Sequence, residues 1–345
     1  MRGRFFICNT PSAAMASSVL HRPVESATQS SRSPSRSAAK VAILRCWIGR
    51  NDTVRKFTAL TLAAACATAA MPAHPEGSVT ATHRYHEVHG SKLYIETFGT
   101  GAPIVFLHGG LRFFDTNFAR QRDYFASFRK VIGIDRSGHG HSPDTAQPFS
   151  YVQMAEDTAA VIEQLGLGPV DVVGHSDGGN IGLILARDHP QLVRRLVISG
   201  ANLRAALPAE ELKRRSQWTP QQIAEKAREI ATKLPPNFRT EYEKVSPDGA
   251  EHWWTLVTKS YQLWSTPVVI EPADLKTIKL PVLVMAGDQD FTPIEETLEI
   301  YRNLAQGQLI ILPGTGHGTM TQRPQLANLA MREFFERADK DKEPP

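Results

Sequence analysis

Cysteine is scarce in this sequence and confined to one end. The chain has 345 residues and three cysteines, Cys8, Cys46 and Cys66. The segment after Cys66 cannot form a disulfide, so an oxidising compartment is compatible with it but not required. The longest charge-free apolar stretch is short and rich in Ala and Thr, which excludes a polytopic membrane protein. The content of 41% hydrophobic and 21% charged residues excludes fibrous and wholly disordered classes.

Charge is also unevenly distributed. Residues 1–75 hold ten Lys and Arg but only two acids, a net charge of +8, and the remaining 29 basic and 33 acidic side chains give −4. The whole-chain charge of +4 therefore does not indicate a nucleic-acid partner, because the body lacks a basic stripe. No Walker-type phosphate loop is present either.

Residues 1–75 are predicted to be a leader outside the folded body. Residues 26–37 are rich in Ser, Arg and Pro without a period, which is typical of disorder. Residues 54–73 combine Arg55-Lys56, an uncharged stretch and small residues, the pattern of a secretory signal. We therefore expect translation to start near Val54 and the protein to be exported, periplasmic or secreted, without stable membrane insertion after processing. A transit peptide, an uncleaved anchor, a lipoprotein at Cys66 and a cytoplasmic protein with a non-functional signal are the alternatives.

From residue 79 onward, short apolar strands alternate with amphipathic helices. Uninterrupted apolar strands in such an alternation indicate a mostly parallel sheet buried on both faces. The prediction is an α/β core of about eight strands, built from residues 76–200 and 276–340. The strands are expected at residues 82–88, 93–98, 103–107, 131–134, 170–173, 196–198, 282–285 and 309–312.

Residues 201–275 break this alternation, because they hold helical patterns without apolar strands. One helix is predicted to start with Thr219 as its N-cap, Pro220 in the first turn and Gln222 completing a capping box. The segment is therefore a helical insertion between two strands of the sheet. Four of the five tryptophans lie in it, namely Trp218, Trp253, Trp254 and Trp264.

A candidate nucleophile follows the apolar strand at 170–173. Residues 174–178 read Gly-His-Ser-Asp-Gly, a G-x-S-x-G string between a strand and a helix. A serine on such a sharp turn has a strained backbone, and its flanking glycines allow neighbouring elements to approach closely. The N-terminus of the following helix favours the anion that develops on attack. We predict that Ser176 is the nucleophile.

Serine needs a base that an acid orients, and in this arrangement the order along the chain is Ser, acid, His. The strand at 282–285 leads to Asp288 and Asp290. Asp290 is preferred as the acid, and Asp288 is expected to hydrogen-bond the turn backbone instead. The last strand leads to His317, the only histidine after His252. His317 is therefore the predicted base.

Two backbone N–H groups are expected to form an oxyanion hole. One belongs to Asp177, the residue after the nucleophile. The other comes from the loop after Leu107, with Gly110 as the first choice and Leu111 as the second.

Five motifs in order resemble the α/β-hydrolase family over residues 80–338. They are HGG at 108–110, DRSGHGHS at 135–142, GHSDGG at 174–179, GDQDFTP at 287–293 and GTGH at 314–317. The family often has D-x-R-G-x-G-x-S in the second motif, where this chain has Ser137 in the place of the arginine and Arg136 before it. That loop is structural, so the departure does not affect the catalytic prediction.

The resemblance implies that the insertion at 201–275 is a helical cap over the substrate pocket. Its aromatic side chains, among them Trp253, Trp254 and Trp264, would suit an apolar or aromatic substrate group. Packing inside the cap itself is the alternative. SDGG followed by ISGAN at 198–202 is similar to the valacyclovir-hydrolase, or biphenyl-hydrolase-like, branch. This likeness implies that Asp177 holds a substrate ammonium, with helix capping as the alternative.

These features predict a serine hydrolase that cleaves a carboxylic ester of a small molecule through an acyl-enzyme. A carbon–carbon bond hydrolase, a perhydrolase or an acyltransferase would use the same residues, and a non-catalytic ligand receptor is the alternative of another class. No cofactor or metal is implied. His83, His86 and His89 alternate faces of a strand, so three of them cannot converge on one metal. The oligomeric state is not predicted.

Overall fold

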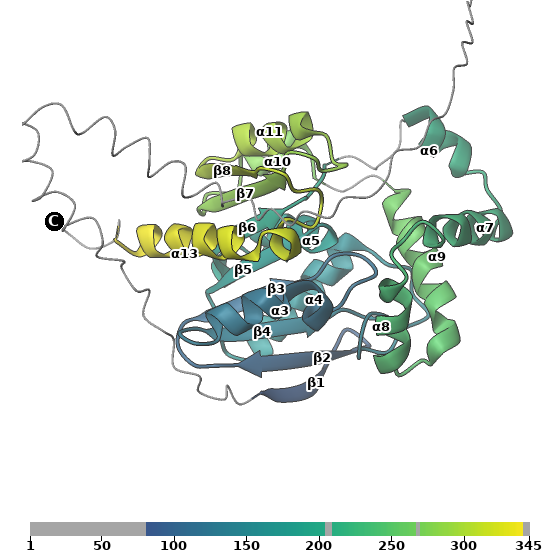
Figure 1. Cartoon of the computed structure of the whole chain (residues 1–345), viewed down its shortest axis with the longest axis horizontal. Coiled ribbons are helices and arrows are strands. Elements are labelled where there is room, and N and C mark those ends of the chain that lie inside the picture. The colour runs from purple at the N-terminus through teal and green to yellow at the C-terminus, as the bar shows by residue number, and fades with distance from the viewer. Residues whose placement is uncertain (1–80, 204–208, 267–269, 341–345) are drawn as a thin grey trace, which may run out of the picture. The chain divides into compact units, whose positions relative to one another are not determined.

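The computed structural model describes residues 81–203, 209–266 and 270–340 (Figure 1). The chain divides into two units, Met1–Ala73 and His74–Pro345, and every described residue belongs to the second. The predicted leader 1–75 and its signal-like segment 54–73 lie outside the described residues. Within the described ranges, no helix has both the length and the apolar character that crossing a membrane requires.

Eight strands form one sheet in the order β1-β2-β4-β3-β5-β6-β7-β8. The pairs β1–β2 and β2–β4 are antiparallel, and every pair from β4 to β8 is parallel. This mostly parallel sheet with flanking helices confirms the predicted fold class. The strands are β1 (Thr82–Val88), β2 (Ser91–Phe98), β3 (Pro103–Leu107), β4 (Lys130–Asp135), β5 (Val170–His175), β6 (Val193–Ser199), β7 (Val282–Gly287) and β8 (Gly307–Leu312).

Helices cover both faces of the sheet, as uninterrupted apolar strands require. On β3, Ile104 and Phe106 face a cluster with α3 and α13, and Val105 and Leu107 face a second cluster with α4 and α5. Successive strand residues point to opposite faces, so both faces must be apolar. The helices of the core are α3 (Phe114–Phe125), α4 (Tyr151–Gln164), α5 (Asp177–Asp188), η1 (Pro190–Leu192), α11 (Ile294–Asn303), α12 (Thr319–Gln322) and α13 (Pro324–Lys340).

Contacts with neighbouring segments set both ends of α3, the helix after β3. Its start is fixed by the amide of Phe114, which donates to Asp135 Oδ1 at 2.8 Å. Its end is fixed by a turn in which the amides of Phe128 and Arg129 both donate to the carbonyl of Phe125. Contacts with β4 and the following turn therefore set the bounds of α3.

Between β6 and β7, helices α6 to α9 form a separate layer, the cap, whereas the short helix α10 packs beside α11 of the core (Figure 1). The capping box of Thr219 and Gln222 starts α7 as predicted. The cap has an apolar core of its own that includes Tyr242, Trp253 and Leu256. The helices of this segment are α6 (Ala209–Arg215), α7 (Pro220–Ala231), α8 (Asn237–Val245), η2 (Ala250–His252), α9 (Trp253–Trp264) and α10 (Pro272–Leu275).

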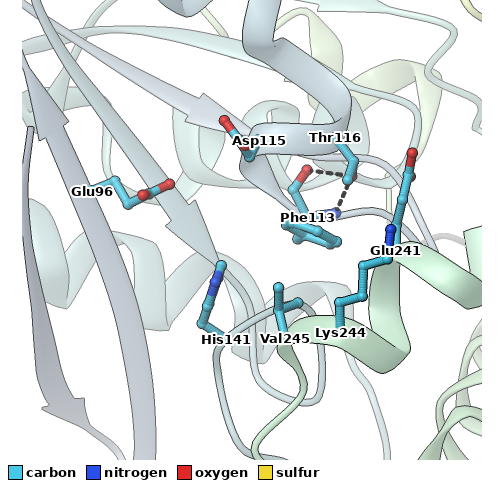
Figure 2. Close-up of a pocket in the computed structure, with 8 residues that line it drawn as sticks. All are labelled: Glu96, Phe113, Asp115, Thr116, His141, Glu241, Lys244 and Val245. Carbon is cyan, nitrogen blue, oxygen red and sulfur yellow. Dashed lines mark hydrogen bonds between the residues drawn. The ribbon is translucent and has the colours of Figure 1, made fainter. Parts of the chain in front are cut away.

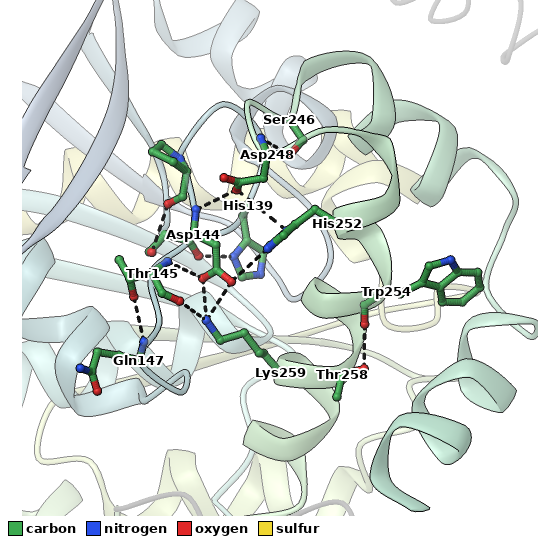
Figure 3. A network of polar contacts seen from close by, with 12 residues as sticks. His139, Asp144, Thr145, Gln147, Ser246, Asp248, His252, Trp254, Thr258 and Lys259 are labelled. Atoms are coloured by element: carbon green, nitrogen blue, oxygen red, sulfur yellow. Dashed lines mark hydrogen bonds and ion pairs between the residues drawn. The ribbon is translucent and has the colours of Figure 1, made fainter. Parts of the chain in front are cut away.

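A buried carboxylate fastens the cap to the core (Figure 3). Asp144, in the loop after β4, accepts from Lys259 Nζ on α9 at 2.7 and 2.8 Å. His252 Nε2 lies 3.3 Å from the same carboxylate, and the amide of Asp144 donates to Asp248 Oδ2 at 2.8 Å. Two cap segments thus converge on one core residue. We call this group the Asp144 clamp.

The strand order places a switch point at the centre of the sheet. β3 lies between β4 and β5. The chain therefore passes from β3 to β4 on one side of β3, and the next strand, β5, lies on the other side. Ligands of open α/β sheets bind beyond the carboxyl ends of the strands at such a point. The loop after β3 and the turn after β5 meet there, and they carry the predicted oxyanion loop and the predicted nucleophile.

Candidate active site

Ser176 occupies a strained turn between β5 and α5. Its backbone has φ 53° and ψ −119°, a region that residues other than glycine rarely adopt. Its amide donates to the carbonyl of Ser199 on β6 at 2.8 Å. A Cβ on Gly178 would lie 1.9 Å from the carbonyl oxygen of Leu107, so only glycine lets α5 approach β3 this closely. The neighbouring strands therefore hold the turn.

Three side chains from three loops form a hydrogen-bonded relay. His317 Nε2 lies 2.8 Å from Ser176 Oγ, and His317 Nδ1 lies 2.9 Å from Asp290 Oδ1. Asp290 follows β7 and His317 follows β8, so the carboxyl ends of parallel strands bring them to Ser176. The structure therefore brings the predicted nucleophile, base and acid together.

The two candidate aspartates have different partners. Asp290 accepts from His317 and from the amide of Thr292 at 2.9 Å. Burial alone would raise the pKa of Asp290, but the hydrogen bond and positive charge offered by His317 outweigh it, so this pKa is lowered. Asp288 instead accepts from the amide of Thr315 at 3.1 Å and ties the loop after β7 to the loop after β8. Asp290 is thus the carboxylate placed to orient the imidazole.

The oxyanion loop offers a limited choice of donors. The amide of Gly109 donates to Asn117 Oδ1 at 2.7 Å and is occupied, which leaves Gly110 and Leu111 as candidates. Leu111 has φ 58°, a conformation that costs roughly 1–2 kcal/mol for a residue with a Cβ. Asp177 opens α5, and the first amides of a helix lack partners within it. The loop after β3 and the start of α5 therefore supply the candidate donors on the side of Ser176.

Two supporting residues were missed by the sequence analysis. His175 Nε2 donates to the carbonyl of His317 at 2.9 Å, and His175 Nδ1 lies 3.2 Å from Asn117 Oδ1. Burial, with the nearby His317, lowers the pKa of His175 to about 4, so its ring is neutral at pH 7. His175 thus holds the histidine loop, and Asn117 separately holds the oxyanion loop through the amide of Gly109. The position of His175 directly before Ser176 was the only sequence signal for it.

The carboxylate of Asp177 is buried and engaged. It accepts from Tyr151 OH on α4 at 2.8 Å and from Trp264 Nε1 on α9 at 3.0 Å. Of the aromatic residues expected to bind substrate, Trp264 is therefore the one that contacts the residue beside Ser176. Recognition of a substrate ammonium by Asp177 stays a prediction.

The other two expected aromatic residues lie elsewhere in the cap. Trp253 is 2% exposed and packs against Tyr242 at a ring distance of 5.7 Å. The guanidinium groups of Arg228 and Arg239 lie 5.3 and 5.0 Å from the ring centre of Trp254, which points away from the Asp144 clamp in Figure 3. These contacts correspond to the packing alternative.

An aromatic side chain that the sequence analysis did not single out lies over the base. The ring of Phe291 is 4.1 Å from the ring of His317, although 73% of the Phe291 surface is exposed. It directly follows Asp290 in the chain. Phe291 thus covers one side of the imidazole.

The described histidines form no metal site. Among residues 81–203, 209–266 and 270–340, no three His, Cys, Asp or Glu side chains are grouped to hold a metal ion. His139 is buried and stacks against Phe149 at 5.1 Å, and His141 Nδ1 lies 2.9 Å from Asp135. These two histidines instead belong to the packing and hydrogen bonding of the loop after β4.

A pocket of about 550 Å³ opens between α3 and the cap helix α8 (Figure 2). None of its lining residues belongs to the Ser176 relay. Burial, together with Asp135 and Asp115, raises the pKa of Glu96 to about 7. The lining residues are Glu96, Phe113, Asp115, Thr116, His141, Glu241, Lys244 and Val245.

The raised pKa of Glu96 predicts a pH-dependent effect of Glu96→Gln. The folded protein keeps the Glu96 proton up to about pH 7, whereas the unfolded chain releases it near 4.5, so wild type loses stability as pH rises between these values. Glutamine mimics the protonated acid. The variant should therefore gain about 1–2 kcal/mol in unfolding free energy relative to wild type from pH 4.5 to pH 8. Urea denaturation at both pH values measures the gain, and a difference that is independent of pH would contradict this interpretation.

The sheet, the cap and the Ser176 relay together define an α/β hydrolase. The sequence profile of the Alpha/beta hydrolase family matches residues 104–328, and the chain belongs to this family. It is 27% identical to (E)-2-((N-methylformamido)methylene)succinate hydrolase of Acinetobacter baylyi, over 69% of this chain and 92% of that one. It is 28% identical to a non-heme haloperoxidase of Rhodococcus erythropolis, over 72% and 97%. A solved meta-cleavage product hydrolase from Pseudomonas fluorescens has the same fold, with a TM-score of 0.60, 20% identity and coverage of 74% and 98%.

Proposed function

We propose that the protein hydrolyses a carboxylic ester, or a related acyl bond, of a small molecule through an acyl-enzyme. The observation that carries this proposal is the unbroken relay from Ser176 Oγ through His317 to Asp290. Such a relay activates a hydroxyl that is otherwise a weak nucleophile.

The proposed reaction has two halves. Ser176 Oγ attacks the acyl carbon while His317 takes its proton, and Asp290 stabilises the imidazolium. The amides of Asp177 and Gly110 stabilise the oxyanion, the C–O bond breaks, and His317 passes the proton to the leaving alcohol. A water molecule then repeats the sequence on the acyl-enzyme and releases the acid and free Ser176. The residues of this chain provide every proton transfer in this scheme.

The haloperoxidase relative favours a second candidate reaction. In a perhydrolase, hydrogen peroxide replaces water as the nucleophile that resolves the acyl-enzyme and yields a peracid. The same relay serves both reactions, since only the second nucleophile differs. The similarity of 28% identity over 72% of the chain supports testing peroxide alongside water.

Mass spectrometry of the intact enzyme tests the proposal. A fluorophosphonate should add one phosphonyl group, mapped to the peptide that contains Ser176, and p-nitrophenyl acetate should be turned over. Steady-state assays of esters, of a dienone ring-cleavage product and of esters with peroxide separate ester, carbon–carbon and perhydrolytic activity. A protein that is neither labelled nor active on any of these substrates would contradict the proposal and favour the alternative of a non-catalytic ligand receptor.

The proposed ammonium recognition by Asp177 has its own test. An aminoacyl ester and its des-amino analogue differ only in the group that Asp177 would bind. A higher kcat/KM for the aminoacyl ester would support the proposal. Equal values would contradict it and would leave Tyr151 and Trp264 as the partners of this carboxylate.

Export remains a proposal as well. It is supported by the signal-like pattern at residues 54–73. N-terminal sequencing of natively expressed protein tests it. A mature N-terminus shortly after residue 73 would support export, and a start well before residue 54 would contradict it.

A further inference from the structure

The oxyanion loop is built against the cap rather than against the sheet alone. Three consecutive residues, Gly110, Leu111 and Arg112, each contact cap side chains. They follow Gly109, whose amide is held by the core residue Asn117. The loop therefore changes from core contacts to cap contacts between Gly109 and Gly110. Gly110 is also the first candidate oxyanion donor of the loop.

Leu111 is anchored inside the cap. It is 3% exposed and packs in the cluster of Ala227, Tyr242, Trp253 and other cap residues. Among the described residues, it is the one buried member of that cluster from outside α7, α8 and α9. Its backbone is left-handed, with φ 58°. A residue with a Cβ keeps this conformation only where neighbouring groups hold it. The packing of the Leu111 side chain in the cap supplies that fixation.

Arg112 fastens the next residue of the loop to α8. Its Nη1 donates to Glu241 Oε2 at 3.2 Å, and its guanidinium lies 4.6 Å from the ring centre of Phe238. Its Nη2 donates to the carbonyl of Thr116 on α3. One side chain thus joins the cap, the oxyanion loop and the core.

Gly110 is wedged between the cap and the nucleophile turn. A Cβ on Gly110 would lie 2.5 Å from Trp264 Cζ2 and 2.6 Å from Asp177 Oδ2. Trp264 also donates to the Asp177 carboxylate. Both proposed oxyanion donors therefore belong to residues in contact with the last residue of α9.

We infer that the docked cap holds the oxyanion loop in its catalytic conformation, with Arg112, Leu111 and Trp264 as positioning residues. This inference rests on the proposed function. When the cap shifts, the left-handed turn at Leu111 loses its support and the two amides no longer converge. The cap therefore sets the rate of the chemical step as well as the shape of the pocket. Stabilisation of the transition state is lost first, because the donors serve the oxyanion and not the bound ester.

The test compares Arg112→Met and Trp264→Phe with wild type in the full chain. Arg112→Met should lower kcat/KM for p-nitrophenyl acetate by about 10- to 100-fold. This decrease is smaller than the decrease in kcat that follows removal of a whole oxyanion donor. KM should change by less than about threefold. Affinity for a trifluoromethyl ketone, which forms a tetrahedral adduct with the serine, should fall by the same factor. Trp264→Phe removes the N–H that donates to Asp177 and also the indole atoms that lie against Gly110, among them Cζ2, and should show a loss of the same pattern. Arg112→Lys should recover part of the activity.

Arg239→Met is the matched control, because the partners of Arg239 are the cap residues Glu243, Glu251 and Trp254. It should leave kcat and the ketone affinity unchanged. Circular dichroism checks that each variant is folded. If Arg112→Met does not fold, the result for Trp264→Phe decides the outcome. Unchanged kcat/KM, or a rise in KM without a parallel loss of ketone affinity, would overturn the inference. A wild-type protein that is not labelled at Ser176 would instead overturn the proposed function.

Discussion

Replacing Ser176 with alanine is expected to lower kcat for p-nitrophenyl esters by about 10⁴- to 10⁶-fold and to abolish fluorophosphonate labelling. The substitution removes Oγ, the atom that lies 2.8 Å from His317 Nε2, and leaves the amides of the oxyanion loop in place. Single-turnover kinetics measure the residual rate. A variant that retained its turnover would rule out the serine mechanism.

The relay also predicts how substitutions combine. His317→Gln should cost about as much as Ser176→Ala, and the double variant should be little worse than either, because residues that act as a unit are not additive. Thr258→Ala, at a hydroxyl that donates within cap helix α9, is a control that should keep wild-type kcat. Independent multiplicative losses at Ser176 and His317 would contradict a shared step.

Asp171→Asn is expected to reduce the unfolding free energy by about 3–5 kcal/mol. Asp171 on β5 is fully buried and accepts from Arg194 and Arg195 at 2.7 to 2.9 Å, and also from Arg129. Burial by itself would raise the pKa of Asp171, but the hydrogen bonds of Arg195 and Arg194 lower it overall. The amide would leave three arginines facing one neutral group. Urea denaturation at pH 7 measures the loss.

A second aspartate provides the comparison for this stability effect. Asp188 pairs with the adjacent Arg187 at 2.7 Å near the surface, and Asp188→Asn should cost no more than about 1 kcal/mol. Equal losses for the two variants would show that the buried cluster is no more stabilising than a surface pair. The kcat of folded Asp171→Asn should stay near that of wild type, because Asp171 contacts none of the relay residues.

The sheet and the relay were largely predictable from local patterns. Each relay residue lies in the turn or loop that follows an apolar strand, and parallel strands bring their carboxyl ends to one edge. The choice between Asp288 and Asp290 rested on their positions in the loop, and their hydrogen-bond partners distinguish them in the structure.

Contacts between distant parts of the chain were not predictable in this way. The partners of Asp177 are 26 and 87 residues away, and no local pattern identifies them. The position of the buried Trp253 and the partly buried Trp264 on one side of α9 does follow from their spacing, since eleven residues make about three helical turns. Trp254 is rotated away from that face, so the helical period alone would have separated it from the other two.

The insertion of the cap between β6 and β7 affects the order in which an active enzyme is assembled. During synthesis the N-terminal parts of a chain emerge first, and they begin to fold while the rest is made. Ser176 and its turn can form with β3, β5 and β6, whereas Asp290 and His317 arrive with β7 and β8, after the whole cap. A ribosome-bound or truncated chain that ends before residue 317 therefore lacks the proposed base, and its Ser176 has no partner to take the proton.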